Sequence, residues 1–184
     1  MLWETSSAAT QGRPSRRPEP DGRGVSVYNK ILVPLDGSKL AEEVLPHVQD
    51  LAQRYRSEVI LIQVVPLLSK LVMETEAVSM GEASAGPEAA TAVAKAERER
   101  AHFYLENVAK RLKAAGIRVR AEILAGEAGD AVVAYANSEA MDLIAMSTHG
   151  RSGLGRLVYG SVADHVLRHA GAPVLLIRSG KTEA

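Results

Sequence analysis

The chain alternates between short, strongly apolar segments and longer segments with helical periodicity, and this alternation limits its fold more than any other feature. Runs of Val, Ile and Leu a few residues long are typical of buried strands, whereas apolar positions three or four residues apart are typical of helices. Five strand signals alternate with four helix signals between residues 28 and 178. This pattern predicts an α/β fold, a single doubly wound domain with a five-stranded parallel sheet and helices on both faces.

The expected elements follow from the apolar spacing and from Gly and Pro. The expected strands lie at residues 28–34, 58–65, 117–124, 141–146 and 173–178. The expected helices lie at residues 41–55, 87–115, 130–137 and 158–170. Pro46 interrupts the first helical pattern, which indicates either a kink or a later start, and Gly116 is expected to end the second helix. The residues of the second helix expected to face the core are Val93, Phe103, Tyr104, Val108 and Leu112.

The composition argues against several classes of function. The 184 residues include 22 basic and 22 acidic ones, so no overall field attracts nucleic acid or a membrane surface. Aromatic residues make up 4%, too few for a platform that stacks single-stranded nucleic acid. The lack of cysteine excludes disulfides and thiolate metal sites, and no apolar run reaches the roughly 18 residues of a membrane span. We expect a soluble, cytoplasmic protein with no nucleic-acid or membrane partner.

Both ends of the chain and one internal segment lack the alternation. Residues 1–27 are rich in Ser, Pro, Gly and Arg with almost no hydrophobic periodicity, so they bury too little apolar area to offset the entropy of ordering them. We expect a disordered N-terminal tail at 1–27, one domain at 28–178 and a flexible C-terminus at 179–184. Residues 66–86 show no firm period, which indicates a long connection.

One loop has the residues that bind an anion. The apolar run 143–146 leads into residues 147–155, which include Ser, Thr, His and three glycines, and a helical pattern begins near Gly160-Ser161. Glycines let the backbone approach a ligand closely, and the unpaired N–H groups and dipole of a helix start favour negative charge. The working hypothesis is that this loop binds the phosphates of a nucleotide.

A second loop, Asp36-Gly37-Ser38, follows the first expected strand. Asp36 is an acceptor that can take two ribose hydroxyls, although Asp-Gly-Ser is also ordinary turn chemistry. Ligands of doubly wound folds lie beyond the carboxyl ends of the strands, where the strand order reverses. If the strand order is 3-2-1-4-5, this loop and residues 147–155 meet there and form one site.

Two segments carry a resemblance to a known family. KILVPLDGS at 30–38 and LIAMSTHGRSGLGRLVYGSVADHVLRHAGAPVLLIR at 143–178 resemble the universal stress protein family, and the likeness extends from residue 28 to residue 178. The nucleotide-binding branch of that family is marked by Gly, two residues, Gly, nine residues, and then Gly with Ser or Thr. Gly150, Gly160 and Ser161 match this pattern, and Ser147 stands in place of the first Gly.

The resemblance implies a site for ATP, or for AMP or cyclic AMP, with Mg²⁺ held through the phosphates and not by protein side chains. The implied nucleotide-binding residues are Pro34, Leu35, Asp36, Val64, Met146, Ser147, Gly150, Gly160, Ser161 and Val162, with His149, Arg151 and Gly153 as further candidate phosphate contacts. The resemblance also implies a homodimer through the last strand, Val174 to Ile177, whose apolar edge invites pairing.

No catalytic residue is predicted. The P-loop pattern ending in Gly-Lys-Ser/Thr is absent, and so is a Gly-x-Gly-x-x-Gly after the first strand. His149 has no Asp, Glu or His cluster with metal-ligand spacing beside it. The pattern therefore favours a hydrogen-bonded loop residue over a base or a metal ligand.

Three functions remain open at this point. The first is a regulatory stress-response protein that binds an adenine nucleotide with little or no hydrolysis. The second is an enzyme, either a slow ATPase or an AMP-transferring relative, for which the sequence offers no partner that orients a catalytic group. The third is an interaction module that binds no nucleotide and acts by dimerisation. We expect the first, because the phosphate cradle is complete and no base or lysine is evident beside it.

Overall fold

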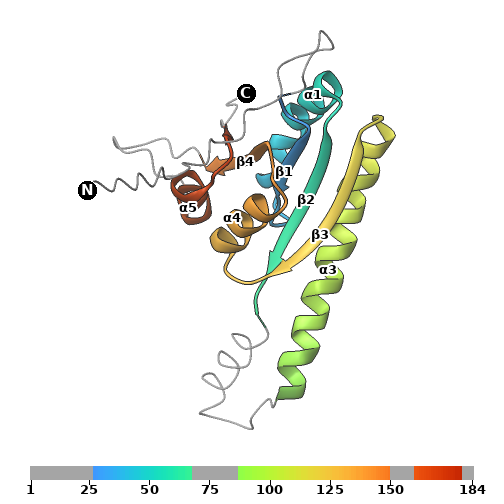
Figure 1. The fold of residues 1–184 in the computed structure, drawn as a ribbon. Coiled ribbons are helices and arrows are strands. Elements are labelled where there is room, and N and C mark those ends of the chain that lie inside the picture. The colour runs from blue at the N-terminus through green and yellow to red at the C-terminus, as the bar shows by residue number, and fades with distance from the viewer. Residues whose placement is uncertain (1–26, 68–86, 150–159, 180–184) are drawn as a thin grey trace, which may run out of the picture.

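The structure, a computed structural model, describes residues 27–67, 87–149 and 160–179 (Figure 1). Residues 1–26 and 180–184 of the predicted tails and residues 68–86 of the predicted connection lie outside these ranges. Residues 27 and 179, which were predicted to belong to the tails, lie inside them. In chain order, the elements are β1 (Lys30–Pro34), the 3-10 helix η1 (Ala41–Val44), α1 (Leu45–Tyr55), β2 (Glu58–Val65), α3 (Pro87–Ala114), β3 (Arg118–Ala125), α4 (Ala128–Ser138), β4 (Leu143–His149), α5 (Ser161–His169) and β5 (Val174–Ser179).

The five strands form one parallel sheet in the order β3-β2-β1-β4-β5. The central strand β1 pairs with β2 from Lys30↔Glu58 onward and with β4 through Ile31↔Leu143. The chain therefore moves outward from β1 to β3 and then returns to the other side of β1. The predicted fold class and strand order are confirmed, and the carboxyl ends of β1 and β4 lie side by side at the point where the order reverses.

Helices cover both faces of the sheet and enclose two cores. Side chains alternate across a strand, so β1 directs Ile31 and Val33 into the core under α1 and α3, and Leu32 into the core under α4 and α5. The central strands are buried on both sides, as a parallel sheet requires. Figure 1 shows α3 running along β3 and extending past the end of the sheet, with α4 and α5 together on the other face.

Two residues of α3 that were predicted to face the core lie on its solvent side. Phe103 is 71% exposed and Val93 is 47% exposed. At about 100° per residue, Phe103 is about 200° around the helix from the buried Leu105, so the two side chains point in nearly opposite directions. The error came from weighting large apolar side chains above the helical period. The residues of α3 that are buried are Ala90, Ala101, Leu105, Val108, Ala109 and Leu112.

Pro46 marks a later start of the first α-helix, which was one of its two predicted readings. The turn before it is the 3-10 helix η1, and Pro46 lies in the first turn of α1, where its missing N–H removes no hydrogen bond. Ser38 shapes the approach to η1. Its Oγ accepts the N–H of Ala41 at 3.0 Å, and its own N–H donates to Asp36 Oδ1 at 2.9 Å.

Hydrogen bonds tie down the amino ends of the central strands. The carboxylate of Asp142, just before β4, accepts the N–H groups of Asn29 and Lys30, each 2.9 Å from Oδ2. Just before β2, the buried hydroxyl of Ser57 donates to the carbonyl oxygen of Tyr28. The polar groups that enter the sheet at this end therefore have partners, as buried polar groups normally do.

Candidate functional site

A pocket of about 320 Å³ lies at the carboxyl ends of β1, β2 and β4 and beside the starts of α4 and α5. This volume is within the range of small-molecule sites. Nine of the ten residues predicted to bind a nucleotide line it. They are Pro34, Leu35, Asp36, Val64, Met146, Ser147, Gly160, Ser161 and Val162.

The remaining predicted residues fall where the structure gives no side-chain description. Gly150, Arg151 and Gly153 lie outside the described residues. His149 is the last residue of β4, but its side chain is not described. The expected convergence of the two loops is therefore observed for the loop after β1, the end of β4 and the start of α5, and the middle of the glycine loop stays a prediction.

Seven further residues line the pocket and were not among the predicted binding residues, although Thr148 belongs to the loop predicted to bind phosphates. They are Leu40, Ala41, Ile62, Ala128, Val132, Thr148 and Ala163. The period-2 pattern of a strand offered one signal, because Thr148 continues the face that holds Ile144 and Met146. Residues of α4 carried no comparable signal, because their place beside the pocket depends on how α4 packs across the sheet.

Asp36 is the only acidic or basic side chain among the described residues that line the pocket. Its Oδ1 accepts the Ser38 N–H, which orients the carboxylate and leaves Oδ2 able to accept from a ligand. Nearby, burial and the carboxylates of Glu42 and then Asp36 raise the pKa of Tyr104. The rim formed by the loop after β1 is therefore acidic, and it suits hydroxyl or amino donors better than phosphates.

The start of α5 forms the opposite rim and suits an anion. Gly160 precedes the helix with φ −56° and makes no side-chain cap, so the first-turn N–H groups are left to other partners. A Cβ built on Gly160 meets no atom of the described residues within 4 Å. The backbone of this helix start is therefore open on the side of the missing side chain.

Two hydroxyls at the end of β4 complete the polar part of the pocket. Ser147 Oγ and Thr148 Oγ1 are both buried, and neither has a hydrogen-bond partner among the residues that the structure describes. Because side chains alternate along a strand, Ser147 lies on the face of Leu143 and Ala145, and Thr148 lies on the face of Met146.

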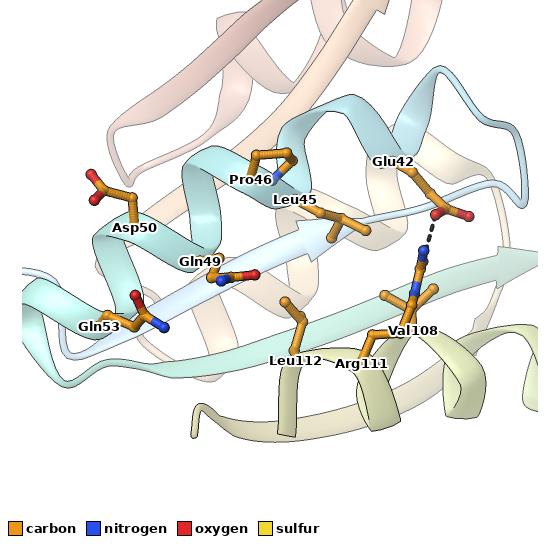
Figure 2. A pocket seen from close by; sticks show the side chains of 9 residues that line it. All are labelled: Glu42, Leu45, Pro46, Gln49, Asp50, Gln53, Val108, Arg111 and Leu112. Carbon is orange, nitrogen blue, oxygen red and sulfur yellow. Dashed lines mark hydrogen bonds and ion pairs between the residues drawn. The ribbon is translucent and has the colours of Figure 1, made fainter. Parts of the chain in front are cut away.

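A second cleft, of about 480 Å³, lies between α1 and α3 (Figure 2). Leu45, Val108 and Leu112 point into it, and the ion pair between Glu42 and Arg111 spans one end. Its rim of glutamines and an ion pair offers no glycine-rich backbone. The cleft shares η1 with the first pocket, because residues 40 and 41 line that pocket and residues 42 and 45 line this one.

The described parts of the chain place limits on other kinds of site. Within residues 27–67, 87–149 and 160–179, no group of three or more His, Asp or Glu side chains is arranged to hold a metal ion. None of the described helices is long and apolar enough to cross a membrane.

The fold and the pocket first define a class, an open, doubly wound α/β domain with a ligand-sized pocket at the switch point of its sheet. Residues 27–178 match the model of the universal stress protein family. The universal stress protein MJ0531 of Methanocaldococcus jannaschii is 31% identical over 160 residues, which cover 87% of this chain and 88% of that protein. The chain therefore belongs to the universal stress protein family, and the resemblance seen in the sequence is confirmed.

Solved structures share the fold over most of both chains. The structure of the hypothetical protein MJ0577 is 29% identical with a TM-score of 0.68, and the match covers 85% of this chain and 99% of that one. A universal stress protein in complex with cAMP is 18% identical with a TM-score of 0.56, covering 83% and 98%. An Arabidopsis thaliana family protein with AMP bound is 17% identical with a TM-score of 0.55, covering 84% and 94%. At these identities the last two matches show the fold alone.

Proposed function

We propose that the chain is an adenine-nucleotide-binding universal stress protein with a regulatory role in the stress response and with little or no hydrolysis. The observation that carries the proposal is the convergence of nine predicted binding residues on one pocket at the switch point of the sheet. Support from relatives is the AMP and cAMP named with two proteins of the same fold. ATP, with Mg²⁺ held through its phosphates, is the ligand we expect this chain to prefer.

The pocket divides into parts that suit the parts of a nucleotide. Ile62, Val64 and Met146 supply an apolar wall for the adenine ring. The free oxygen of Asp36 supplies an acceptor for ribose hydroxyls, and the start of α5 at Gly160 supplies N–H donors for phosphates. The acidic and the anion-binding rims lie on different elements, which fixes the orientation of the ligand.

Calorimetric titration with ATP, AMP and cyclic AMP, together with mass spectrometry of the purified protein without heating, tests the binding. Gly160→Val is the matched variant. Valine adds no backbone strain at φ −56°, and its Cβ meets no atom of the described residues within 4 Å, but its side chain is expected to fill the cradle. We expect at least a tenfold loss of affinity, with a smaller loss for Gly160→Ala and an unchanged Tm. Wild-type protein that neither carries nor binds an adenine nucleotide would leave the interaction module as the function.

The same protein incubated with Mg²⁺ and ATP tests the proposed lack of hydrolysis. Asp36 is the only acidic or basic side chain among the described lining residues, and its carboxylate accepts the Ser38 N–H. We expect ATP to be recovered intact after hours, at a protein concentration high enough for all of the ATP to be bound. Product formation that Gly160→Val abolishes would support the slow ATPase instead.

We also propose a homodimer through β5. This strand is at the edge of the sheet, and its apolar residues Val174 to Ile177 are only half-buried. The other edge strand, β3, carries Arg118, Arg120 and Glu122 instead, and charges at an edge oppose pairing. Leu176→Glu is expected to shift sedimentation toward the monomer, whereas Ala121→Glu on β3 is the matched control and leaves the dimer intact. A dimer that persists in Leu176→Glu would place the interface elsewhere.

A further inference from the structure

Two polar residues are buried to more than nine-tenths among the described residues, and they lie at opposite ends of the sheet. Ser57 is 2% exposed and Thr148 is 5% exposed. The hydroxyl of Ser57 donates to the carbonyl oxygen of Tyr28. The hydroxyl of Thr148 has no hydrogen-bond partner within the described ranges. Because a buried polar group without a partner destabilises the folded state, Thr148 requires an explanation that Ser57 does not.

The side chain of Thr148 lines the pocket. It lies on the face of β4 that also holds Ile144 and Met146, under α4 and α5. Along a strand, residues two apart are about 6.6 Å apart, so Thr148 is that much nearer the end of β4 than Met146. Gly160 and Ser161, at the start of α5, line the same pocket.

Valine has nearly the shape of threonine and lacks the hydroxyl. A valine at position 148 would fill the same space without burying a polar atom. The hydroxyl therefore lowers the stability of the free protein, and it becomes favourable when a ligand supplies an acceptor. An anionic oxygen is the acceptor that gains most, because hydrogen bonds to charged groups are stronger than those between neutral groups.

We propose that the Thr148 hydroxyl donates a hydrogen bond to a phosphate oxygen of the bound nucleotide and so distinguishes nucleotides from nucleosides. This inference rests on the proposed function and adds a phosphate-reading residue that the glycine pattern does not include. Position selects phosphate over base, because Thr148 is nearer the end of β4 than Met146 and lines the pocket together with the start of α5, whereas Val64 and Met146 form the apolar wall. The acidic rim at Asp36 belongs to the loop after β1 and not to β4.

Calorimetric titration of Thr148→Val and Thr148→Ser with ATP, AMP and adenosine tests the proposal. We expect Thr148→Val to bind AMP and ATP roughly tenfold or more weakly, while its affinity for adenosine stays within about twofold. Thr148→Ser keeps the hydroxyl and is expected to retain most of the affinity for AMP and ATP. The Tm of free Thr148→Val is expected to equal or exceed that of the wild type by up to about 2–4 °C.

Ser57→Ala is the matched control, because it removes a buried hydroxyl that has a partner. We expect its Tm to fall and its affinity for all three ligands to stay unchanged. The proposal is overturned if Thr148→Val binds ATP as the wild type does, or if it loses adenosine and ATP equally, which would assign the hydroxyl to the nucleoside part. Wild-type protein that binds none of the three ligands would overturn the proposed function and this inference together, whereas either of the other results overturns this inference alone.

Discussion

The two ends of the sheet are built from the same strands but treat their polar groups differently. At the amino end, the Asp142 carboxylate takes two backbone N–H groups and the Ser57 hydroxyl reaches a carbonyl oxygen. At the carboxyl end, Ser147 and Thr148 hold buried hydroxyls that have no hydrogen-bond partner in the described part of the chain. The first end contributes to stability without a ligand, whereas under the proposed function the hydroxyls of the second end gain a partner only when a ligand binds. Substitutions at the two ends should therefore separate stability from affinity.

The largest effect is expected from Asp142→Ala at the amino end. The substitution leaves two N–H groups at the start of β1 without their charged acceptor, and we expect a loss of about 3 kcal/mol in the free energy of unfolding, or roughly 6–12 °C in Tm. Chemical denaturation measures the loss. Asp50→Ala, which breaks an exposed pair with Arg54, serves as the control and is expected to change the stability little. Nucleotide affinity that falls along with stability in Asp142→Ala would contradict the separation of the two ends.

A smaller effect is expected from Gly129→Ala. This substitution tests whether a change in helix packing beside the pocket lowers both the stability and the affinity. A Cβ at Gly129 would approach the His165 ring atoms Cγ and Cδ2 to 2.8 Å, and His165 Nε2 lies 2.9 Å from Asp130 Oδ1. The ring must therefore move, and α4 and α5 must shift at the pocket. After the gain in helix propensity, we expect a net loss of about 1–2 kcal/mol and weaker nucleotide binding.

The double variant Gly129→Ala/His165→Ala removes the clash and should recover part of the affinity that Gly129→Ala loses. Thermal unfolding and calorimetry of the two variants measure both quantities. An unchanged affinity in Gly129→Ala would mean that the α4–α5 contact does not shape the pocket.

Asp36→Ala is expected to act on affinity with little change in stability, because the residue is exposed. Loss of the ribose acceptor should weaken ATP, AMP and adenosine alike by about tenfold, or about 1.4 kcal/mol. Asp36→Asn keeps an acceptor for the Ser38 N–H. It therefore distinguishes the effect of losing the turn hydrogen bond from the effect of losing the negative charge. Equal binding by Asp36→Ala and the wild type would remove this loop from the site. Unlike Thr148→Val, this variant should not discriminate adenosine from ATP.

The smallest effect is expected from Tyr104→Phe and is confined to alkaline pH. Burial, Glu42 and Asp36 raise the pKa of Tyr104 in the folded state, so the unfolded chain releases this proton first. The resulting stability is fully present below about pH 10, the pKa of the unfolded residue, and is lost as the pH rises through the folded pKa. Urea denaturation between pH 9 and pH 11 should show a shallower decline in Tyr104→Phe than in the wild type. Parallel curves would mean that other groups control the decline.

Particular residues show how far the sequence could predict the fold and the site. The period of each strand and the order of turns were sufficient for β2, which begins and ends where it was predicted, and for the meeting of Asp36 with the end of β4. The face of α3 was not predictable from large apolar residues, because Ala101 and Ala109 are buried and Phe103 is exposed. Helix faces follow the period of all small and apolar positions, and large residues in a long charged helix can point outward.

The parts of the site contributed by α4 illustrate a different limit. Ala128 and Val132 line the pocket, yet nothing local in their sequence distinguishes them from ordinary helix residues. They reach the ligand site because α4 crosses the sheet beside α5. Thr148 is an intermediate case, because strand alternation gives its face, but only the packed structure reveals that its hydroxyl is buried without a partner.

The 3-10 helix η1 lies between the pocket at the switch point and the cleft between α1 and α3. Residues of this one turn line both hollows. A compound that entered the outer cleft and displaced Arg111 from Glu42 would bind against the same turn that carries Leu40 and Ala41. Screens that report displacement of a labelled nucleotide would then count such a compound as a competitor. Competition assays on this protein therefore need a direct structural or saturation measurement before a hit is assigned to the pocket at the switch point.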